Sequence, residues 1–542
     1  MPVIAPRTPR GAEEGAGSRT RTPAAARCES LAPTTTPDTV HLAVCGQSVV
    51  LAHGESQTFN HQEAVVMAGT RAGRMIDRAS SADLTNLVIG IGPVPMQVGA
   101  VLILENDKPF DLAAAREVIG RRVSRVVRLR QRLLRTPPGC GRPIWMYDPA
   151  FDIGRHVRAV ICPPPADEDA VLTVVAALVT EPLPLRSPLW SATFVTGLAG
   201  RRTALVLVMH HVLADGIGGL AVLANLVDGP TASPAVPLAS EATLPSPLRL
   251  AADAWIARLR ALRHSIGHLR RLRSGLAELG SPRTLHAPPS SLNQPTGPRR
   301  HLAVVRADLT AVHHLARRQG ASVNDVVLTA VTGALRTLLH QRGERAEEFV
   351  VSVPVSARVA ASAAHLGNQV GAMAVLLPAT GAPLQRLRRI AAITRARKAT
   401  NRGSSAAVLG PLFRALSAAG VLGWFMNHQR MVSTYVTNLR GPSDPLTFNG
   451  SAIREIIPVS SAHGNVTVTF TVLSYTGTLV ITIVADRDRC PDLPVLTDAL
   501  QAEIDALYLM QASSSEDRPV DGQPDELAIG PALGARPPAA AK

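Results

Sequence analysis

The stretch Leu207–Leu220 reads LVMHHVLADGIGGL and holds the residue types that proton-transfer chemistry needs. His210 and His211 are adjacent, and the pair Asp215-Gly216 follows the second histidine after three residues. A neutral imidazole within ~3 Å of a hydroxyl group can remove its proton while the oxygen attacks an acyl group. Histidine, with an unperturbed pKa near ~6.5, is neutral and basic enough for this task at physiological pH. The stretch therefore predicts a histidine general base.

The residues before the histidines predict how the pair is held. Thr203–Met209 (TALVLVM) is apolar at both alternating positions, which is typical of a strand buried on both faces. If the strand continues through the pair, the two imidazoles point to opposite sides. One histidine then faces a cleft and can take a proton, while the other faces the surrounding structure.

The residues after the histidines predict a change of element. Gly216, Gly218 and Gly219 indicate a tight turn with a close backbone approach, and the apolar segment 220–227 indicates a helix. A metal site would use His211 and Asp215, four residues apart on one helical face. The preceding β-run and the missing third ligand argue against it, so we expect no metal. Two hydrogen-bonded core histidines at a strand end remain the structural alternative.

The string His210-His211-Val-Leu-Ala-Asp215-Gly216 resembles the HHxxxDG signature of the coenzyme A-dependent acyltransferase superfamily. Chloramphenicol acetyltransferase, dihydrolipoyl acyltransferases and peptide-synthetase condensation domains belong to that superfamily. The resemblance implies that His211 is the general base, that His210 and Gly216 belong to the catalytic motif, and that Asp215 orients the loop through a salt bridge. The acyl donor is an activated thioester, acyl-CoA, which is a substrate, so the resemblance implies no cofactor. The chain has no G-x-S-x-G motif, which agrees with direct transfer.

Further segments are similar to one branch of that superfamily, the bacterial wax ester synthase/acyl-CoA:diacylglycerol acyltransferases. They follow one another through about 75–510: MIDRASSADLTNL, PMQVGAVLILE, FDIGRHV, SPLWSATFVTGL, SLNQPTGPRR, SVNDVVLTAVTGALR, HLGNQVGAMAVLLP, YVTNLRGPSDPLTFNG and VTVTFTVLSYTGTLVITIVADRD. The usual S-P-x-D start reads SSAD here, and the loop AHGNVT lacks residues that are common there. The resemblance implies an α/β protein with two chloramphenicol acetyltransferase-like lobes, mixed sheets and an active-site channel between the lobes.

Candidate substrate-binding residues outside the histidine motif are Asn324, Asp325, Gly367 and Asn368. Ser322 followed by Asp325 is the pattern of a capping box that opens a helix. Asn324 would point its amide either at the acyl carbonyl or at the architecture of the helix end. Gly367-Asn368 fits a crossover loop that places one lobe against the other, and Pro188-Leu189-Trp190 fits strand packing.

A chain of 542 residues exceeds what one hydrophobic core usually organises, so two domains are expected. The patterned blocks are 75–228, an N-terminal lobe with the histidine motif, and 299–510, a C-terminal lobe. Residues 229–298 connect them. Residues 1–74 are expected to be a disordered extension or the product of a mis-assigned start, and the polar tail 511–542 is expected to be disordered. The 5 scattered cysteines fit a reducing cytosol better than a disulfide framework.

The formal charge of +15 comes almost entirely from arginine, since the only lysines are Lys108, Lys398 and Lys542. Net basicity favours anionic partners, which include coenzyme A, acidic lipid headgroups and nucleic acid. Combined with the resemblance, it favours acyl-CoA and a lipid surface, with no nucleic acid as partner.

A basic amphipathic helix is predicted inside the connection. Its apolar residues recur every three or four positions: Trp255, Leu259, Leu262, Ile266, Leu269, Leu272, Leu276 and Leu279. Six arginines fill much of the rest: Arg258, Arg260, Arg263, Arg270, Arg271 and Arg273. The helix either packs on its own protein with a solvated basic face or lies on a membrane surface. No apolar run approaches the ~18–20 residues of a transmembrane helix, so we expect a cytoplasmic protein peripherally associated with the cell membrane or lipid droplets.

The sequence thus predicts an acyl-CoA-dependent O-acyltransferase that makes triacylglycerol from diacylglycerol, wax ester from a long-chain alcohol, or both. A condensation-type domain that acts on carrier-bound acceptors shares HHxxxDG, but no carrier or adenylation module adjoins it here. A basic membrane- or nucleic-acid-binding protein that has lost activity is the second alternative. The intact motif from His210 to Gly216 speaks against it.

Overall fold

The computed structural model describes residues 44–45, 48–49, 76–90, 92–229, 244–263, 286–356, 370–400, 406–460 and 462–516. The chain divides into two units, Met1–Met75 and Ile76–Lys542. The described part of the first unit is an antiparallel pair of short strands, β1 (Val44–Cys45) and β2 (Ser48–Val49). Everything that follows concerns the second unit.

The first lobe is built on a six-stranded mixed sheet with the order β13-β14-β3-β8-β7-β6. Its strands are β3 (Gln97–Glu105), β6 (Val157–Ile161), β7 (Trp190–Leu198), β8 (Arg202–His210), β13 (Thr447–Phe448) and β14 (Ser451–Val459). Only the β6–β7 pair is parallel among these strands. Every residue of β8 after Arg202 is buried, so the predicted strand buried on both faces is confirmed.

Helices cover both faces of this sheet. They are α3 (Leu112–Val123), α4 (Ile153–His156), α5 (Glu168–Thr180) and α6 (Gly216–Leu226). One face packs with α3 and α6 around Leu205 and Leu207 of β8. The other face packs on α5, whose Val175 belongs to one apolar cluster with Val206 of β8 and Val480 of the second lobe. Helix α5 is therefore part of the core that joins the two sheets.

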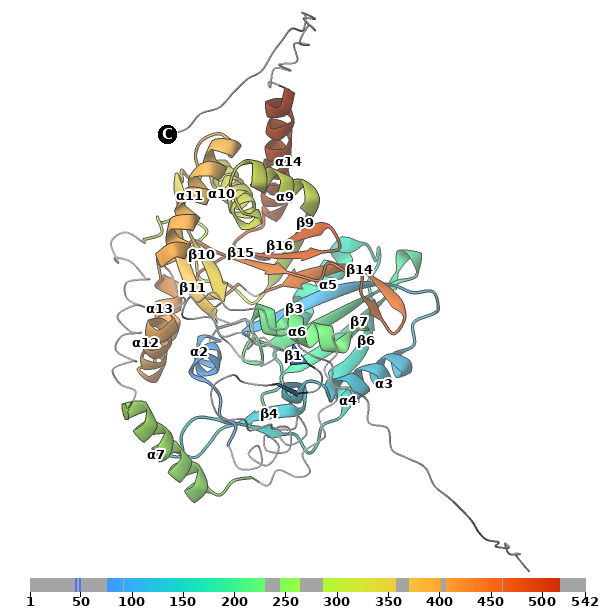
Figure 1. Ribbon diagram of the computed structural model, residues 1–542, viewed down its shortest axis with the longest axis vertical. Helices are drawn as coiled ribbons and strands as arrows, with labels where there is room; N and C mark the ends of the chain where they lie inside the picture. Colours follow the sequence, from blue (N-terminus) through green and yellow to red (C-terminus); the bar gives the residue numbers. More distant parts are fainter. Residues whose placement is uncertain are drawn as a thin grey trace, which may run out of the picture. The chain divides into compact units, whose positions relative to one another are not determined.

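The second lobe is built on another six-stranded mixed sheet with the order β11-β10-β12-β15-β16-β9. Its strands are β9 (Arg300–Asp308), β10 (Glu348–Ser356), β11 (Val370–Pro378), β12 (Thr434–Arg440), β15 (Val468–Tyr475) and β16 (Thr478–Asp486). Figure 1 shows four helices gathered on one face of this sheet: α9 (Leu309–Arg318), α10 (Val323–Gln341), α11 (Pro383–Thr400) and α14 (Leu493–Glu516). Two mixed sheets with flanking helices confirm the predicted α/β fold with two lobes.

Strand β14 belongs by sequence to the C-terminal block but pairs in the first sheet. In that sheet Val459 of β14 lies opposite Gly99 of β3, and Gln97 of β3 lies opposite His210 of β8. The end of β14, the start of β3 and the end of β8 therefore lie at one edge, which we call the histidine edge. The next strand, β15, lies in the second sheet, so the chain crosses between lobes at this edge.

Smaller elements complete the second unit. They are α2 (Ser81–Ile89), the strand pair β4 (Gln131–Leu134) and β5 (Ile144–Tyr147), α7 (Pro247–Arg263), α12 (Ala406–Ala418) and α13 (Leu422–His428). Helix α7 contains the start of the predicted amphipathic helix, and residues 264–279 of that prediction lie outside the described residues. No helix among the described residues is long and apolar enough to cross a membrane.

Helix α7 packs through a different face from the one the sequence indicated. Leu250 and Ala254 are buried, and Arg78 holds the helix by an ion pair with Asp253 at 2.6 Å. Trp255 and Leu259, which belong to the predicted apolar stripe, are 60% and 55% exposed. For these two residues the expectation of packing on the same protein is wrong, because Leu250 and Ala254 already fill the contact.

We expect a shortened chain that begins at Met75 and ends at Glu516 to keep the thermal midpoint of the full chain. It retains every described helix and strand of the second unit. Differential scanning calorimetry of both chains measures this directly. Loss of soluble protein on shortening would show that the removed residues are needed for folding.

Candidate active site

The histidine pair lies where β8 ends at the histidine edge. His210 is the last residue of the strand, and His211 begins a turn closed by the Leu213 N–H, which donates to the His210 carbonyl at 2.9 Å. The His211 N–H still donates to the carbonyl of Met96, the residue before β3, at 2.8 Å. The strand itself does not continue through both histidines, since it ends at His210, but the bond to Met96 keeps His211 in line with β8.

His210 is a buried residue with a structural partner. Its Nδ1 accepts a hydrogen bond from the Val212 N–H at 3.1 Å, and its own N–H donates to the Leu189 carbonyl at 2.9 Å. Burial, together with the neighbouring His211, lowers the pKa of His210 to about 4. His210 is therefore neutral at physiological pH and holds the turn that carries His211.

The segment Pro188-Leu189-Trp190 anchors the same turn from β7. Leu189 supplies the carbonyl that His210 binds, and the Trp190 indole donates from Nε1 to the Leu129 carbonyl at 2.7 Å. The indole stacks on the ring of His156 with the centroids 4.6 Å apart. These contacts are those of strand packing, as the sequence indicated.

His211 is half-buried and is positioned by a residue that sequence reasoning missed. The Asn86 amide donates to the His211 carbonyl at 3.3 Å and lies 3.4 Å from its Nδ1. Asn86 is on α2, which begins with a capping box between Ser80 and Asp83. The sequence SSAD departs from the family pattern but still starts this helix. Its S-x-x-D spacing is that of a capping box, and it could have predicted the helix that carries Asn86. Because Nδ1 faces α2, Nε2 lies on the opposite side of the ring.

Asp215 and Gly216 start α6 and connect it to the second lobe. The buried Asp215 carboxylate caps the helix by accepting from the Gly218 N–H at 2.9 Å. Gly216, Gly218 and Gly219 are in the first turn of α6, so the expected tight turn is wrong, because the Asp215 cap starts the helix directly. A Cβ on Gly216 would lie 2.6 Å from Leu439 Cδ2, which confirms the close approach. The predicted salt bridge of Asp215 stays a prediction.

Asn324 and Asp325 lie at the start of α10, where the predicted capping box forms between Ser322 and Asp325. The second oxygen of the Asp325 carboxylate accepts from the Thr394 hydroxyl at 2.7 Å. The Asn324 side-chain oxygen accepts from the amide of Asn438 at 3.4 Å. Asn438 is next to Leu439 on β12, and Leu439 packs against Gly216 of the histidine motif. Asn324 is therefore linked to the motif indirectly, through β12. Gly367 and Asn368 lie outside the described residues.

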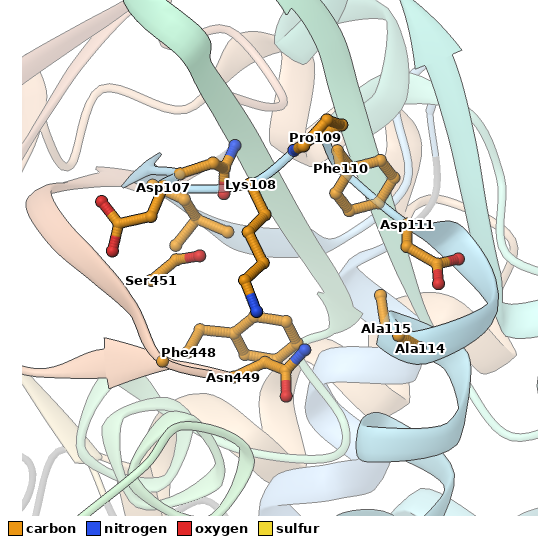
Figure 2. A pocket seen from close by; sticks show the side chains of 13 residues that line it. Asp107, Lys108, Pro109, Phe110, Asp111, Ala114, Ala115, Phe448, Asn449 and Ser451 are labelled. Carbon is orange, nitrogen blue, oxygen red and sulfur yellow. The ribbon is translucent and has the colours of Figure 1, made fainter.

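A cavity of about 400 Å³ lies at the other end of the first sheet. Figure 2 shows Lys108 reaching across it towards Phe448 and Asn449 of the β13–β14 turn. Residues 106–111 line it just beyond Glu105, the end of β3 opposite to Gln97. Because Gln97 is the residue that pairs with His210, this cavity is separate from the histidine edge.

Family comparisons match two regions of the chain. Residues 79–327 match the wax ester synthase/diacylglycerol acyltransferase (WS/DGAT) catalytic domain, and residues 366–508 match the WS/DGAT C-terminal domain. The chain belongs to the WS/DGAT acyltransferase family. Among its relatives is the "probable diacylglycerol O-acyltransferase tgs1" of Mycobacterium tuberculosis. The two are 30% identical over 429 residues, which cover 75% of this chain and 90% of the relative.

Solved structures show the same two-lobed fold for this WS/DGAT chain. The wax ester synthase/diacylglycerol acyltransferase from Marinobacter aquaeolei VT8 superposes with a TM-score of 0.58 at 22% identity, covering 80% of this chain and 100% of that one. The first condensation domain of the calcium-dependent antibiotic synthetase gives a TM-score of 0.56 at 19% identity, covering 81% and 97%. The predicted chloramphenicol acetyltransferase-like architecture is confirmed.

Because His210 is buried in its neutral state, the free energy of unfolding depends on pH. The unfolded chain takes up a proton on this residue near the ordinary pKa of 6.5, whereas the folded protein does so only near about 4. Because the unfolded state binds more protons between these values, the free energy of unfolding falls as the pH is lowered through them.

We therefore expect His210→Gln, which keeps an acceptor for the Val212 N–H but does not titrate, to lose less stability than the parent between pH 6.5 and 4. Part of the acid loss should remain, since burial also lowers the pKa of His156 and His463. Urea denaturation at a series of pH values measures it. Equal slopes in the two proteins would contradict the buried neutral state of His210.

Proposed function

We propose that this WS/DGAT chain is an acyl-CoA-dependent O-acyltransferase in which His211 is the general base. The observation that carries the proposal is the placement of His211. It follows a strand that is buried from Thr203 to His210, its ring lies against the Asn86 amide, and the next helix is capped by Asp215. A base needs this fixed position, because proton transfer works only at hydrogen-bond distance.

The transfer proceeds in two steps with His211 as the only proton carrier. The alcohol oxygen attacks the thioester carbonyl carbon, its proton moves to Nε2 of His211, and the carbonyl electron pair moves to oxygen. The oxyanion then reforms the carbonyl, the carbon–sulfur bond breaks, and the leaving thiolate takes the proton from the imidazolium. The products are the ester and free coenzyme A, and no acyl group is attached to the protein.

The acceptor is a lipid alcohol: diacylglycerol, which gives triacylglycerol, or a long-chain alcohol, which gives wax ester. The domain description that matches residues 79–327 includes both activities, and the relatives named for diacylglycerol O-acyl transfer support the first. The likeness to a condensation domain concerns the fold alone. The substrate channel would run between the lobes to the histidine edge.

The test is to incubate the full-length protein with radiolabelled palmitoyl-CoA and either diolein or hexadecanol, and to resolve the lipids. We expect labelled triacylglycerol or wax ester from the parent. His211→Ala should fold normally and turn over roughly 10²–10⁴-fold more slowly, the usual contribution of a general base. No labelled ester with either acceptor would overturn the proposal, and an active His211→Ala would remove His211 as the base.

We further propose that α7 docks the enzyme on the cytoplasmic membrane or on lipid droplets, where its lipid substrates are. The outer face of α7 exposes Leu248, Trp255, Ile256 and Leu259 by 84%, 60%, 47% and 55%. Arg258 stacks on the Trp255 ring at 5.3 Å, so a cation lies beside the exposed indole. Aromatic and aliphatic side chains with adjacent arginines are the composition of an interfacial helix.

The double variant Trp255→Ser/Leu259→Ser should lose flotation with vesicles that contain anionic lipid while it keeps activity on detergent-dispersed substrate. Leu509→Ser is the matched control, because Leu509 is 71% exposed but lies on α14 in the second lobe. Flotation and an activity assay on the same preparations measure both quantities. If both the parent and the double variant float, docking occurs elsewhere on the protein. If neither floats, the protein does not dock on such vesicles, and in both cases α7 is a solvated helix.

A further inference from the structure

His463 is brought to the histidine edge by the crossover between the two sheets. Strand β14 ends at Val459, and the chain passes through His463 before it enters β15 at Val468. Because β14 and β8 are separated only by β3, the start of this crossover lies about two strand spacings, roughly 10 Å, from His210–His211. The charge of His211 is one of the causes that lower the pKa of His463, so the two rings lie near one another.

The backbone around His463 is held on both sides of the residue. The Ala462 carbonyl accepts from Arg300 Nη2 at 2.5 Å, and the Gly464 carbonyl accepts from both the N–H and the hydroxyl of Thr296 at 3.0 Å. Gly464 has a φ of 67°, and a Cβ there would lie 2.8 Å from the Met426 carbonyl oxygen. Only glycine fits this position, so the direction of the crossover is fixed.

Arg300 is itself fixed by a buried ion pair. It lies 3.1 Å from Asp486, and their side chains are 2% and 0% exposed. A buried pair of this kind needs its remaining donors and lone pairs satisfied. The Ala462 carbonyl takes one Arg300 donor, and backbone N–H groups of Gly297, Asp488 and Arg489 donate to the Asp486 carboxylate. The crossover is therefore one of the partners of this pair, while Arg300 Nε makes no hydrogen bond among the described residues.

The imidazole of His463 has no comparable partner. Its Nδ1 is buried and makes no hydrogen bond among the described residues. Burial, followed by the charges of His211 and Arg300, lowers the pKa of His463 to about 3, so the ring is neutral. The residue as a whole is half-buried.

The neutral ring carries one proton, and its position follows from burial. A buried lone pair without a donor is tolerated better than a buried N–H without an acceptor. The proton is therefore on Nε2, and Nδ1 keeps the lone pair. His463 then carries a neutral N–H donor at the histidine edge.

The sheet beneath the crossover offers further polar groups. On β15, Phe470 and Val472 point into the core that contains α10, so the alternate residues Thr469 and Thr471 face the first lobe. The Thr471 and Ser460 hydroxyls are 2.6 Å apart, and the Thr469 hydroxyl is buried without a partner. The face of β15 towards the first lobe and the start of the crossover therefore carry hydroxyl groups that suit a polar reacting centre.

We propose that His463 is a catalytic residue that donates its Nε2 proton in a hydrogen bond to the carbonyl oxygen of the acyl thioester. This inference rests on the proposed function and names the oxyanion donor that the sequence does not identify. As the alcohol attacks and its proton passes to His211, the carbonyl electron pair becomes the oxyanion that His463 binds. The hydrogen bond persists until the carbon–sulfur bond breaks, and His463 itself neither gains nor loses a proton.

Neutrality is what suits His463 to this task. A cationic donor would repel the imidazolium that forms on His211 and oppose proton uptake there. A neutral imidazole N–H stabilises the developing oxyanion without that penalty, as a neutral histidine does in triosephosphate isomerase.

His463→Leu should keep the thermal midpoint and the KM for palmitoyl-CoA but lower kcat by roughly 10²–10³-fold, as expected for one oxyanion donor. His463→Gln, which retains an N–H donor, should recover part of that loss. In both variants the acid limb of kcat against pH should stay where it is in the parent, because His463 does not titrate in the reaction. His313→Leu, an exposed histidine on α9 of the same lobe, is the control. A kcat within about two-fold of the parent in His463→Leu would overturn the proposal.

A second measurement tests the role of His463 separately from the proposed acyltransferase function. A palmitoyl-CoA analogue with a ¹³C-labelled ketone in place of the thioester binds without reacting, and its carbonyl stretch is read by difference infrared spectroscopy. The stretch should move to lower wavenumber on the parent protein and return towards the solution value on His463→Leu. A parent that makes ester but leaves the stretch equal in both proteins refutes the role of His463 and leaves the proposed function standing. A parent that makes no ester refutes the proposed function instead.

Discussion

The pairing of β14 with β3 is the constraint on which the site depends. It puts a strand from the C-terminal block into the first sheet, and the next strand must then start in the second sheet. The chain can cross only where β14 ends, which is the edge at which β8 delivers His210 and His211. Arg306 of β9 reinforces the junction by binding Glu455 of β14 and Glu168 of α5. The two sides of the site are therefore joined by main-chain hydrogen bonds of a sheet.

The histidines at this edge differ in what surrounds them. His210 and His463 are desolvated and neutral, one bonded to the backbone of its own turn and the other with an unpartnered nitrogen. His211 differs from both, because it is half-buried and its Nδ1 lies beside the Asn86 amide. Because the rings of His210 and His463 stay neutral, His211 is the group that gains charge in the proposed transfer. The buried Arg300–Asp486 pair holds the backbone of the crossover next to His463, because Arg300 also donates to the Ala462 carbonyl.

Local patterns were predictable from the sequence, and contacts between distant segments were not. The β8 run, the Ser322–Asp325 capping box and the strands from Arg300 to Asp486 follow from alternation and capping, which need only neighbouring residues. Asn86 is 125 residues from His211, so no spacing rule connects them. His463 is a lone histidine in a loop without a motif, and only the strand order gives it a place. The sequence left open whether the stripe with Trp255 and Leu259 packs on the protein or faces outward, because that depends on the contact made by Leu250 and Ala254 with distant segments.

We propose that acyl transfer occurs at the histidine edge, between His211 and His463. A crystal structure of the full chain with coenzyme A bound tests it most directly, because the sulfur atom marks where the carbonyl reacts. We predict that this sulfur lies within about 4 Å of His211 Nε2, or one water molecule away, with His463 facing it from the crossover. Coenzyme A seated with its sulfur at the cavity near Lys108, or at any other place remote from His211, would show that transfer does not occur at the histidine edge.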